Sequence, residues 1–130
     1  MNYQERIEKL SDVLQRFLAI EQVKMVELRR KDIPNTPGIY AIYVPNSQKP
    51  LYIGSTNNLR RRIYTNHLKG NREASTLRRK LFKELKDEKS VTGFLETCSI
   101  RFISLEGMSE KEIKSVEHFF IAVLEPEMND

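Results

Sequence analysis

The sequence predicts an α+β fold: a small antiparallel sheet of three strands, made of a β-hairpin and a third strand, with helices around it. Residues 39–44 alternate strand-forming side chains between two faces, and residues 51–53 form a second short strand after a turn-rich stretch. Residues 97–105 alternate in the same way and predict the third strand. Helical spacing of apolar residues recurs in four other stretches. At 130 residues, the chain fits a single domain.

The first helical stretch spans residues 3–20 and belongs to an N-terminal helical extension, residues 1–32, which precedes the main domain, residues 33–130. Its apolar residues recur at three- and four-residue steps: Ile7, Leu10, Leu14, Phe17 and Leu18. This face either packs on the core or serves as an arm for dimerisation or DNA contact. The sequence therefore leaves the oligomeric state open, a homodimer included. Residues 23–31 fit either a short strand or a frayed continuation of the helix.

Two further helices follow the hairpin, whose second strand is expected to stop at Gly54. Polar residues 55–58 can cap the first of them, which has an apolar stripe made of Leu59, Ile63 and Leu68. The second spans residues 75–86, with apolar side chains inward and cationic side chains mostly outward. Residues 90–93 are expected to form a loop.

The last helix spans residues 110–124 and follows the third strand. Ser109 and Glu112 form the capping-box pattern that starts a helix, and Pro126 ends it because proline cannot continue the backbone hydrogen bonding. The predicted order is thus helix, hairpin, two helices, strand, helix.

Charge is concentrated in one block of the chain. The net charge is +4, but residues 58–86 hold ten basic and two acidic residues, whereas residues 87–130 hold four and ten. A positive block of this density predicts binding to a polyanion such as DNA, the alternative being a solvated helix face. The cations expected to contact DNA are Arg60, Arg61, Lys69, Arg72, Arg78, Arg79 and Lys83.

The remaining composition bounds the environment. Cys98 is the single cysteine, so no internal disulfide forms, which fits a reducing compartment. No apolar run approaches the length of a membrane span, and the N-terminus lacks a signal-peptide pattern. We expect a cytoplasmic location and no membrane partner.

Two tripeptides in the hairpin resemble a family signature. Gly38-Ile39-Tyr40 followed by Tyr52-Ile53-Gly54 is similar to the signature of the GIY-YIG nuclease superfamily. Arg62, Glu117 and Asn129 resemble the family's helical arginine, metal-binding glutamate and late asparagine. The resemblance covers roughly residues 33–129. It implies a GIY-YIG-like fold that hydrolyses DNA phosphodiester bonds with Mg²⁺ or Mn²⁺.

The resemblance also implies roles for these side chains. Tyr40 would deprotonate or orient the attacking water, and Tyr52 would position the same water or the phosphate. Arg62 would stabilise charge that builds up at phosphorus. On residue type alone, both tyrosines could instead simply pack in the sheet, and Arg62 could be a surface arginine. Gly38 and Gly54 are expected where the chain turns or the substrate comes close; Asn129 could hydrogen-bond across the site.

Glu117 stands out without the resemblance. Three, four and seven residues away on its helix, its neighbours are apolar: Ile113, Phe120, Ile121 and Leu124. A carboxylate on such a face costs several kcal/mol, at order of magnitude, unless it is paired or bound to a metal. The alternatives are therefore a ligand for Mg²⁺ or Mn²⁺ and an ion pair with Arg62 or another basic residue.

The sequence departs from the family pattern at one position. Many members have a histidine one helical turn after the arginine, where this chain has Asn66. His67 comes next, rotated by about 100° at 3.6 residues per turn. Either His67 reaches the site from a shifted helix, or Asn66 positions a ligand and the tyrosines manage proton transfer.

These observations predict a divalent-metal-dependent DNA endonuclease, with DNA repair or processing as the preferred role. The alternative is a nucleic-acid-binding module of the same fold with little or no catalysis. A structural adaptor that binds a partner through the N-terminal helix is a third class, but nothing positive in the sequence supports it.

Overall fold

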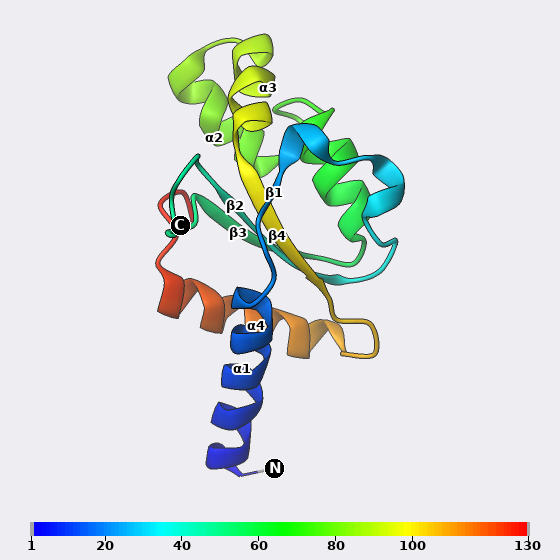
Figure 1. Cartoon of the computed structure of the whole chain (residues 1–130), viewed down its shortest axis with the longest axis vertical. Helices are drawn as coiled ribbons and strands as arrows, with labels where there is room; N and C mark the ends of the chain where they lie inside the picture. The colour runs from blue at the N-terminus through cyan, green and yellow to red at the C-terminus, as the bar shows by residue number, and fades with distance from the viewer. Residues whose placement is uncertain (1, 130) are drawn as a thin grey trace.

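The computed structural model describes residues 2–129, which form one antiparallel sheet of four strands in the order β1-β4-β2-β3 (Figure 1). The sequence predicted three strands, and that prediction is wrong. The additional strand is β1 (Val23–Lys24), the short-strand alternative for residues 23–31, and it pairs with β4 (Ser99–Ser104). Two residues are too few to show alternation, so β1 depends on the partner that it meets.

The centre of the sheet is β2 (Gly38–Tyr43), which pairs with β4 on one side and with β3 (Tyr52–Thr56) on the other. All six residues of β2 are buried. The strand β3 was expected to stop at Gly54, but its pairing with β2 continues to Thr56, which lies opposite Gly38. The hairpin therefore presents both signature tripeptides in the middle of the domain.

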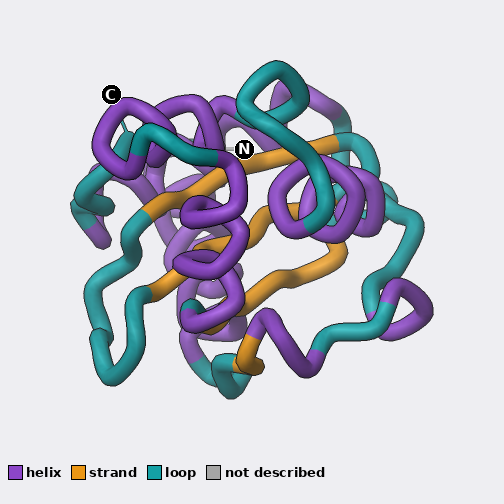
Figure 2. Tube along the Cα trace, turned by 90° about the horizontal axis from the view of Figure 1, so that it is seen from above, coloured by secondary structure: helices purple, strands orange, loops and turns teal. Residues whose placement is uncertain are grey.

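Two apolar clusters cover the two faces of the sheet. Residues of β2 alternate between them: Tyr40 and Ile42 enter one cluster, whereas Ile39, Ala41 and Tyr43 enter the other. Figure 2, seen from above, shows helices passing over the strands. The helices near Tyr40 follow the hairpin in sequence, and the helices near Tyr43 are the first and the last of the chain.

On the Tyr43 side, α1 (Tyr3–Leu18) packs against α4 (Glu110–Leu124) through Phe17 and Phe120, whose ring centroids lie 5.0 Å apart. The second half of α1 thus packs on the core. Its first half projects from the body (Figure 1), and Tyr3 is 84% exposed there. The capping box at the start of α4 is present, which confirms that prediction.

On the Tyr40 side lie η3 (Arg61–Leu68), α2 (Thr76–Leu85) and α3 (Glu88–Thr97). The prediction of a loop at residues 90–93 is wrong, because these residues belong to α3. The Asp87 side chain caps this helix by accepting from the Ser90 N–H at 3.0 Å, and buried Val91 and Leu95 hold it on the core. Two short 3₁₀ turns, Met25–Glu27 and Arg30–Asp32, lead from β1 toward the hairpin.

The end of the chain runs beside the free edge of β3. The N–H of Glu127 donates to the carbonyl of Pro50 at 3.2 Å, and the N–H of Met128 donates to that of Leu51 at 2.8 Å.

No helix within residues 2–129 is long and apolar enough to cross a membrane.

Candidate active site

The two signature tyrosines come from paired strands. Tyr40 lies opposite Gly54, and Tyr52 lies opposite Ile42, which places the two tyrosine ring centroids 6.3 Å apart. Tyr40 is fully buried and Tyr52 is partly buried. The hairpin register therefore brings together two phenols at neighbouring positions.

The signature glycines are explained by close packing. A Cβ on Gly54 would lie 2.3 Å from the Tyr40 hydroxyl oxygen, and a Cβ on Gly38 would lie 2.1 Å from the Ile103 carbonyl oxygen. Both contacts are far shorter than any real Cβ makes. Gly54 thus leaves the space that the Tyr40 side chain occupies, and Gly38 lets β2 pair closely with β4. Both glycines lie within strands, so of the two reasons predicted for them, a turn is wrong and the close approach of substrate stays a prediction.

His67 reaches the site because η3 is a π-helix. The N–H of Lys69 donates to the carbonyl of Tyr64, five residues earlier, at 3.0 Å. At this wider winding, His67 follows Arg62 by one helical turn. His67 Nε2 lies 2.6 Å from the Tyr40 hydroxyl oxygen. The 100° offset assumed 3.6 residues per turn and is wrong; of the two alternatives, His67 and not Asn66 contacts the tyrosine.

The other side of the imidazole is held by α2. His67 Nδ1 lies 2.5 Å from the Ser75 hydroxyl oxygen, and the same oxygen accepts from the Arg78 main-chain N–H at 3.1 Å. Ser75 is the N-cap of α2. The sequence marks Ser75 only as the start of a helix, and no local pattern shows that the chain turns back after η3 to bring this serine to His67.

Arg78 does not lie on the outward face of α2, and its assignment as a DNA contact is wrong. Its guanidinium is buried and donates to the carbonyls of His67 (2.8 Å) and Leu68 (3.3 Å) and to the Thr92 hydroxyl (2.7 Å). The Glu88 carboxylate lies 3.5 Å from Arg78. The reason is α3, which covers this side of α2 and of which residues 90–93 were expected to be a loop.

Burial keeps both partners of the Tyr40–His67 contact neutral. Desolvation raises the pKa of Tyr40 well above its usual value, Tyr52 raises it further, and the charge and hydrogen bond of Arg62 oppose the shift. Desolvation lowers the pKa of His67 to about 3, helped by the positive charges of Arg62 and Arg78. At pH 7 the pair is a phenol beside a neutral imidazole.

Glu117 approaches the same site from α4. Its side chain is 12% exposed, between the buried Ile113 and Phe120, and its negative charge contributes to the raised pKa of Tyr40. Its ion-pair partner is Lys114, at 3.5 Å between Nζ and Oε1, and Lys114 is itself 55% exposed. The sequence left open which basic residue pairs with Glu117. The partner is Lys114, one helical turn away on the same helix, and this spacing is visible in the sequence.

Asn129 binds backbone and does not reach across the site. Its Oδ1 accepts from the Ile53 N–H at 2.8 Å, and its Nδ2 donates to the Ile53 carbonyl at 2.7 Å. The side-chain amide therefore completes the free edge of β3 between Tyr52 and Gly54. This position lets Asn129 fix the strand that carries the second tripeptide.

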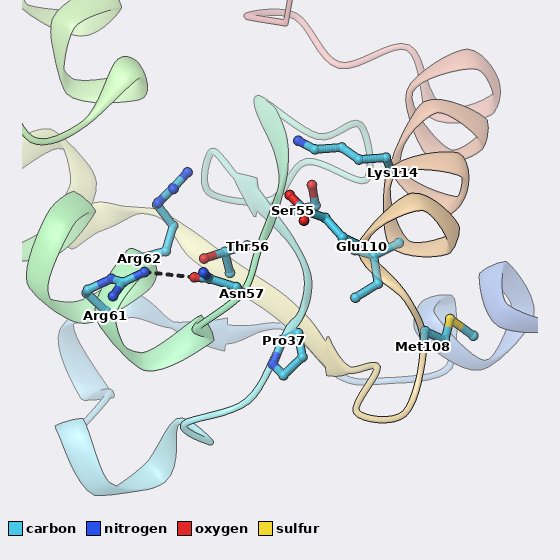
Figure 3. A pocket seen from close by; sticks show the side chains of 10 residues that line it. Pro37, Ser55, Thr56, Asn57, Arg61, Arg62, Met108, Glu110 and Lys114 are labelled. Carbon is cyan, nitrogen blue, oxygen red and sulfur yellow. Dashed lines mark hydrogen bonds between the residues drawn. The ribbon is translucent and has the colours of Figure 1, made fainter.

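A cleft of about 410 Å³ lies next to this constellation (Figure 3). Arg61 and Arg62 border it from one side and Lys114 from α4 on the other, while Pro37 and Met108 supply apolar surface. Its remaining lining residues are Ser55, Thr56, Asn57, Glu110 and Ile113. Because Arg62 belongs to both, the cleft is continuous with the tyrosine site.

The model of one protein family, the GIY-YIG catalytic domain, matches residues 36–129. This chain belongs to the GIY-YIG family. Solved structures of the GIY-YIG N-terminal endonuclease domain of UvrC from Thermotoga maritima are similar in fold. A tyrosine-to-phenylalanine mutant bound to its catalytic divalent cation is 21% identical, with a TM-score of 0.49, and the match covers 82% of this chain and 92% of that one. The magnesium-bound form is 19% identical, with a TM-score of 0.48 and the same coverage.

No curated protein sequence matches this GIY-YIG domain. Family membership makes the chain an endonuclease-type domain. Residues 2–129 contain no group of three or more histidine, cysteine or carboxylate side chains that could hold a metal. A single carboxylate nevertheless fits Mg²⁺, which keeps several waters and also binds substrate phosphates.

The remaining basic residues of the GIY-YIG domain divide by exposure. Arg61, Lys69, Arg72, Arg79 and Lys83 are exposed and available to a polyanion. Arg60 is partly buried, and its Nε donates to the Ile33 carbonyl at 2.8 Å, which ties η3 to the segment before the hairpin. Arg72 lies over the Phe82 ring, 4.1 Å from its centroid, with its side chain still exposed.

Proposed function

We propose that this GIY-YIG domain is a divalent-metal-dependent endonuclease that hydrolyses DNA phosphodiester bonds. The observation that carries the proposal is the contact between Tyr40 and His67 beside Arg62. The Tyr40 phenol and the neutral His67 imidazole offer a path for a proton. The Arg62 guanidinium and the Glu117 carboxylate lie close enough to act on Tyr40 and supply the charges of the site.

The chain's own residues supply the proton path. Because the pKa of Tyr40 is raised, its phenolate is scarce at pH 7, and Tyr40 works instead as a relay. Its oxygen accepts a proton from the attacking water while its own hydroxyl proton passes to His67 Nε2. The water oxygen bonds to phosphorus, and the bond from phosphorus to the leaving oxygen breaks. Tyr52, which is partly exposed, positions the water.

Charge on the phosphoryl oxygens is stabilised by Arg62, whose guanidinium presents donors in a fixed fork that matches phosphate. Glu117 would hold the Mg²⁺ or Mn²⁺, and the bound cation would supply Lewis-acid stabilisation of the leaving-group oxygen. Asn129 and the two glycines act indirectly, because they fix the strands that deliver the tyrosines.

The cleft between η3 and α4 is the proposed seat of the DNA strand, with Arg61 and Lys114 on its two sides. The exposed cations of η3 and α2 extend this surface and would follow the phosphate backbone. DNA repair or processing is the biological role that we favour, and a cytoplasmic location stays a prediction.

A second candidate is a DNA-binding module of the same fold with little or no catalysis. One observation favours it: burial makes Tyr40 a poor acid and His67 a weak base, which slows the relay. The two candidates agree on DNA binding and differ only in turnover.

The deciding experiment incubates the full chain with supercoiled plasmid and millimolar Mg²⁺, with and without EDTA. Nicking is expected for the parent and for the matched control Glu96→Gln on the exposed side of α3. Glu117→Gln is expected to bind DNA, to cleave nothing, and to melt near the parent, since its ion pair with exposed Lys114 is worth at most about 1 kcal/mol. Gel retardation by the parent without any nicking would establish the binding module, and nicking by Glu117→Gln would remove Glu117 from the mechanism.

A further inference from the structure

Ser75 sits where the third group of a hydrogen-bonded chain would be. The chain runs from the Tyr40 hydroxyl to His67 Nε2, a contact of 2.6 Å, and from His67 Nδ1 to the Ser75 hydroxyl, a contact of 2.5 Å. All three residues are buried, with exposed fractions of 3% or less. In nucleophile–base pairs, the base is commonly oriented by a third group in this way.

The proton positions follow from the donors and acceptors that face Tyr40. The buried phenol carries one hydrogen, and Arg62 can only donate to it. His67 Nε2 lies within hydrogen-bond distance of the Tyr40 oxygen, and it can accept the phenol hydrogen when the hydrogen of the ring is on the other nitrogen. A neutral imidazole then carries its hydrogen on Nδ1 and donates it to the Ser75 oxygen.

The position of the Ser75 hydroxyl is fixed by its neighbours. Its oxygen also accepts from the Arg78 main-chain N–H, and the Arg78 guanidinium donates to the carbonyl of His67 itself at 2.8 Å. The same guanidinium reaches the Thr92 hydroxyl on α3 at 2.7 Å. The Arg78 guanidinium therefore holds the backbone of His67, and the Arg78 main chain holds the serine hydroxyl that contacts the imidazole.

We propose that Ser75 is a positioning residue that holds His67 as its Nδ1–H tautomer, with Nε2 left free to accept the Tyr40 proton. The catalytic meaning of this inference rests on the proposed function, whereas the tautomer itself does not. Ser75 acts through His67, so it is not counted as a catalytic residue.

The test is the nitrogen-15 NMR signal of the two ring nitrogens of His67 in the full chain at pH 7. The chain has two histidines, so His118→Gln assigns the spectrum. The parent is expected to show a protonated Nδ1 and an unprotonated Nε2. Ser75→Ala is expected to shift both signals toward the tautomer average, and Ser75→Thr, which keeps the hydroxyl, is expected to restore them.

Loss of a helix cap alone is controlled by Ser109→Ala, which removes the N-cap of α4 and should leave the His67 signals in place. A protonated Nε2 in the parent, or unchanged signals in Ser75→Ala, would overturn the inference. In plasmid nicking, Ser75→Ala is expected to be about tenfold slower than the parent, less than the roughly 10²-fold loss of a missing general base because His67 itself remains, and Ser75→Thr is expected to recover. A parent that does not nick would refute the proposed function, and the NMR result would still decide the tautomer.

Discussion

Tyr40 and Tyr43 lie on the same strand and are both fully buried, yet they point to opposite faces of the sheet. The Tyr43 hydroxyl accepts from Arg101 at 2.8 Å, and the Arg101 guanidinium carbon lies 5.2 Å from the centroid of its ring. The Tyr40 hydroxyl instead meets a neutral imidazole at 2.6 Å. One tyrosine is bound to a permanent donor and the other to a group that can take a proton.

The difference shows that burial does not separate a structural tyrosine from a candidate catalytic one. Burial raises the pKa of both phenols, and an arginine opposes the shift in both cases. Arg101 also donates to the Ile20 carbonyl at 2.6 Å, so its bond to Tyr43 ties the end of α1 to the sheet. Only Tyr40 has a partner through which a proton could leave.

The largest expected effect separates the two tyrosines directly. Tyr40→Phe should slow plasmid nicking by about 10²-fold or more, the scale of general-base catalysis, with DNA binding retained. Tyr43→Phe should keep the nicking rate within a few-fold and lower the unfolding free energy by about 1–3 kcal/mol, because the buried hydrogen bond to charged Arg101 is lost. Equal losses of activity in both variants would show that Tyr40 acts through the fold and not through chemistry.

A second substitution pair tests the space around Tyr40. Gly54→Ala should destabilise the fold by about 1–3 kcal/mol, because its Cβ would overlap the Tyr40 hydroxyl, and it should slow nicking with it. Gly93→Ala is the control, since nothing lies within 4 Å of its added Cβ and alanine favours the α3 helix by about 1 kcal/mol. Urea unfolding of both variants measures the contrast. A Gly54→Ala protein as stable and active as the parent would mean that Tyr40 can move aside freely.

The third prediction concerns the pH dependence of stability that His67 contributes on the Tyr40 side. The pKa of His67 is lowered to about 3, so between pH 6.5 and 3 the unfolded chain binds a proton that the folded protein excludes. Stability should thus fall as pH drops below 6.5, by about 2 kcal/mol between pH 7 and pH 5 from this group.

Urea unfolding at several pH values measures this slope. His67→Gln should remove its share of the pH dependence, and the exposed His118→Gln should not. Parallel stability curves for the parent and His67→Gln would show that the imidazole has the same pKa in the folded and the unfolded chain, against the lowered value.

The smallest expected effect concerns the basic surface on the Tyr40 side. Replacement of Arg79 and Lys83 by alanine should weaken DNA binding a few-fold for all sequences alike and reduce the slope of log affinity against log salt by about 2. Alanine at Lys9 and Arg16, on α1 of the Tyr43 side, is the matched charge control. An unchanged slope in the first variant would assign its two cations to a solvated face.

Several parts of the site could be predicted because they depend on short stretches of sequence. The alternation of residues 39–44 defined the hairpin, and the two tripeptides placed Tyr40 and Tyr52 on neighbouring strands. The pairing of Ser109 with Glu112 predicted the start of α4, and the apolar neighbours of Glu117 showed that its carboxylate was unusual. These features are local, and local backbone preferences suffice to determine them.

Other parts were decided by tertiary contacts. An apolar stripe at three- and four-residue steps does not distinguish an α-helix from a π-helix, so the position of His67 required the structure. Residues 90–93 have weak helical character, and burial of Val91 and Leu95 with the Asp87 cap holds them in α3. Without α3, the inward position of Arg78 could not be anticipated.

The sequence by itself determined the hairpin, the signature residues and the candidate metal ligand. The tertiary structure alone decided the fourth strand, the bond from His67 to Tyr40, the contacts of Ser75 and Arg78, and the pairing of Asn129 with Ile53. The physical reason is that each of these features joins polar groups of different elements, or depends on a helix winding, and local propensity specifies neither. Such partners exist only once the core has brought the segments together.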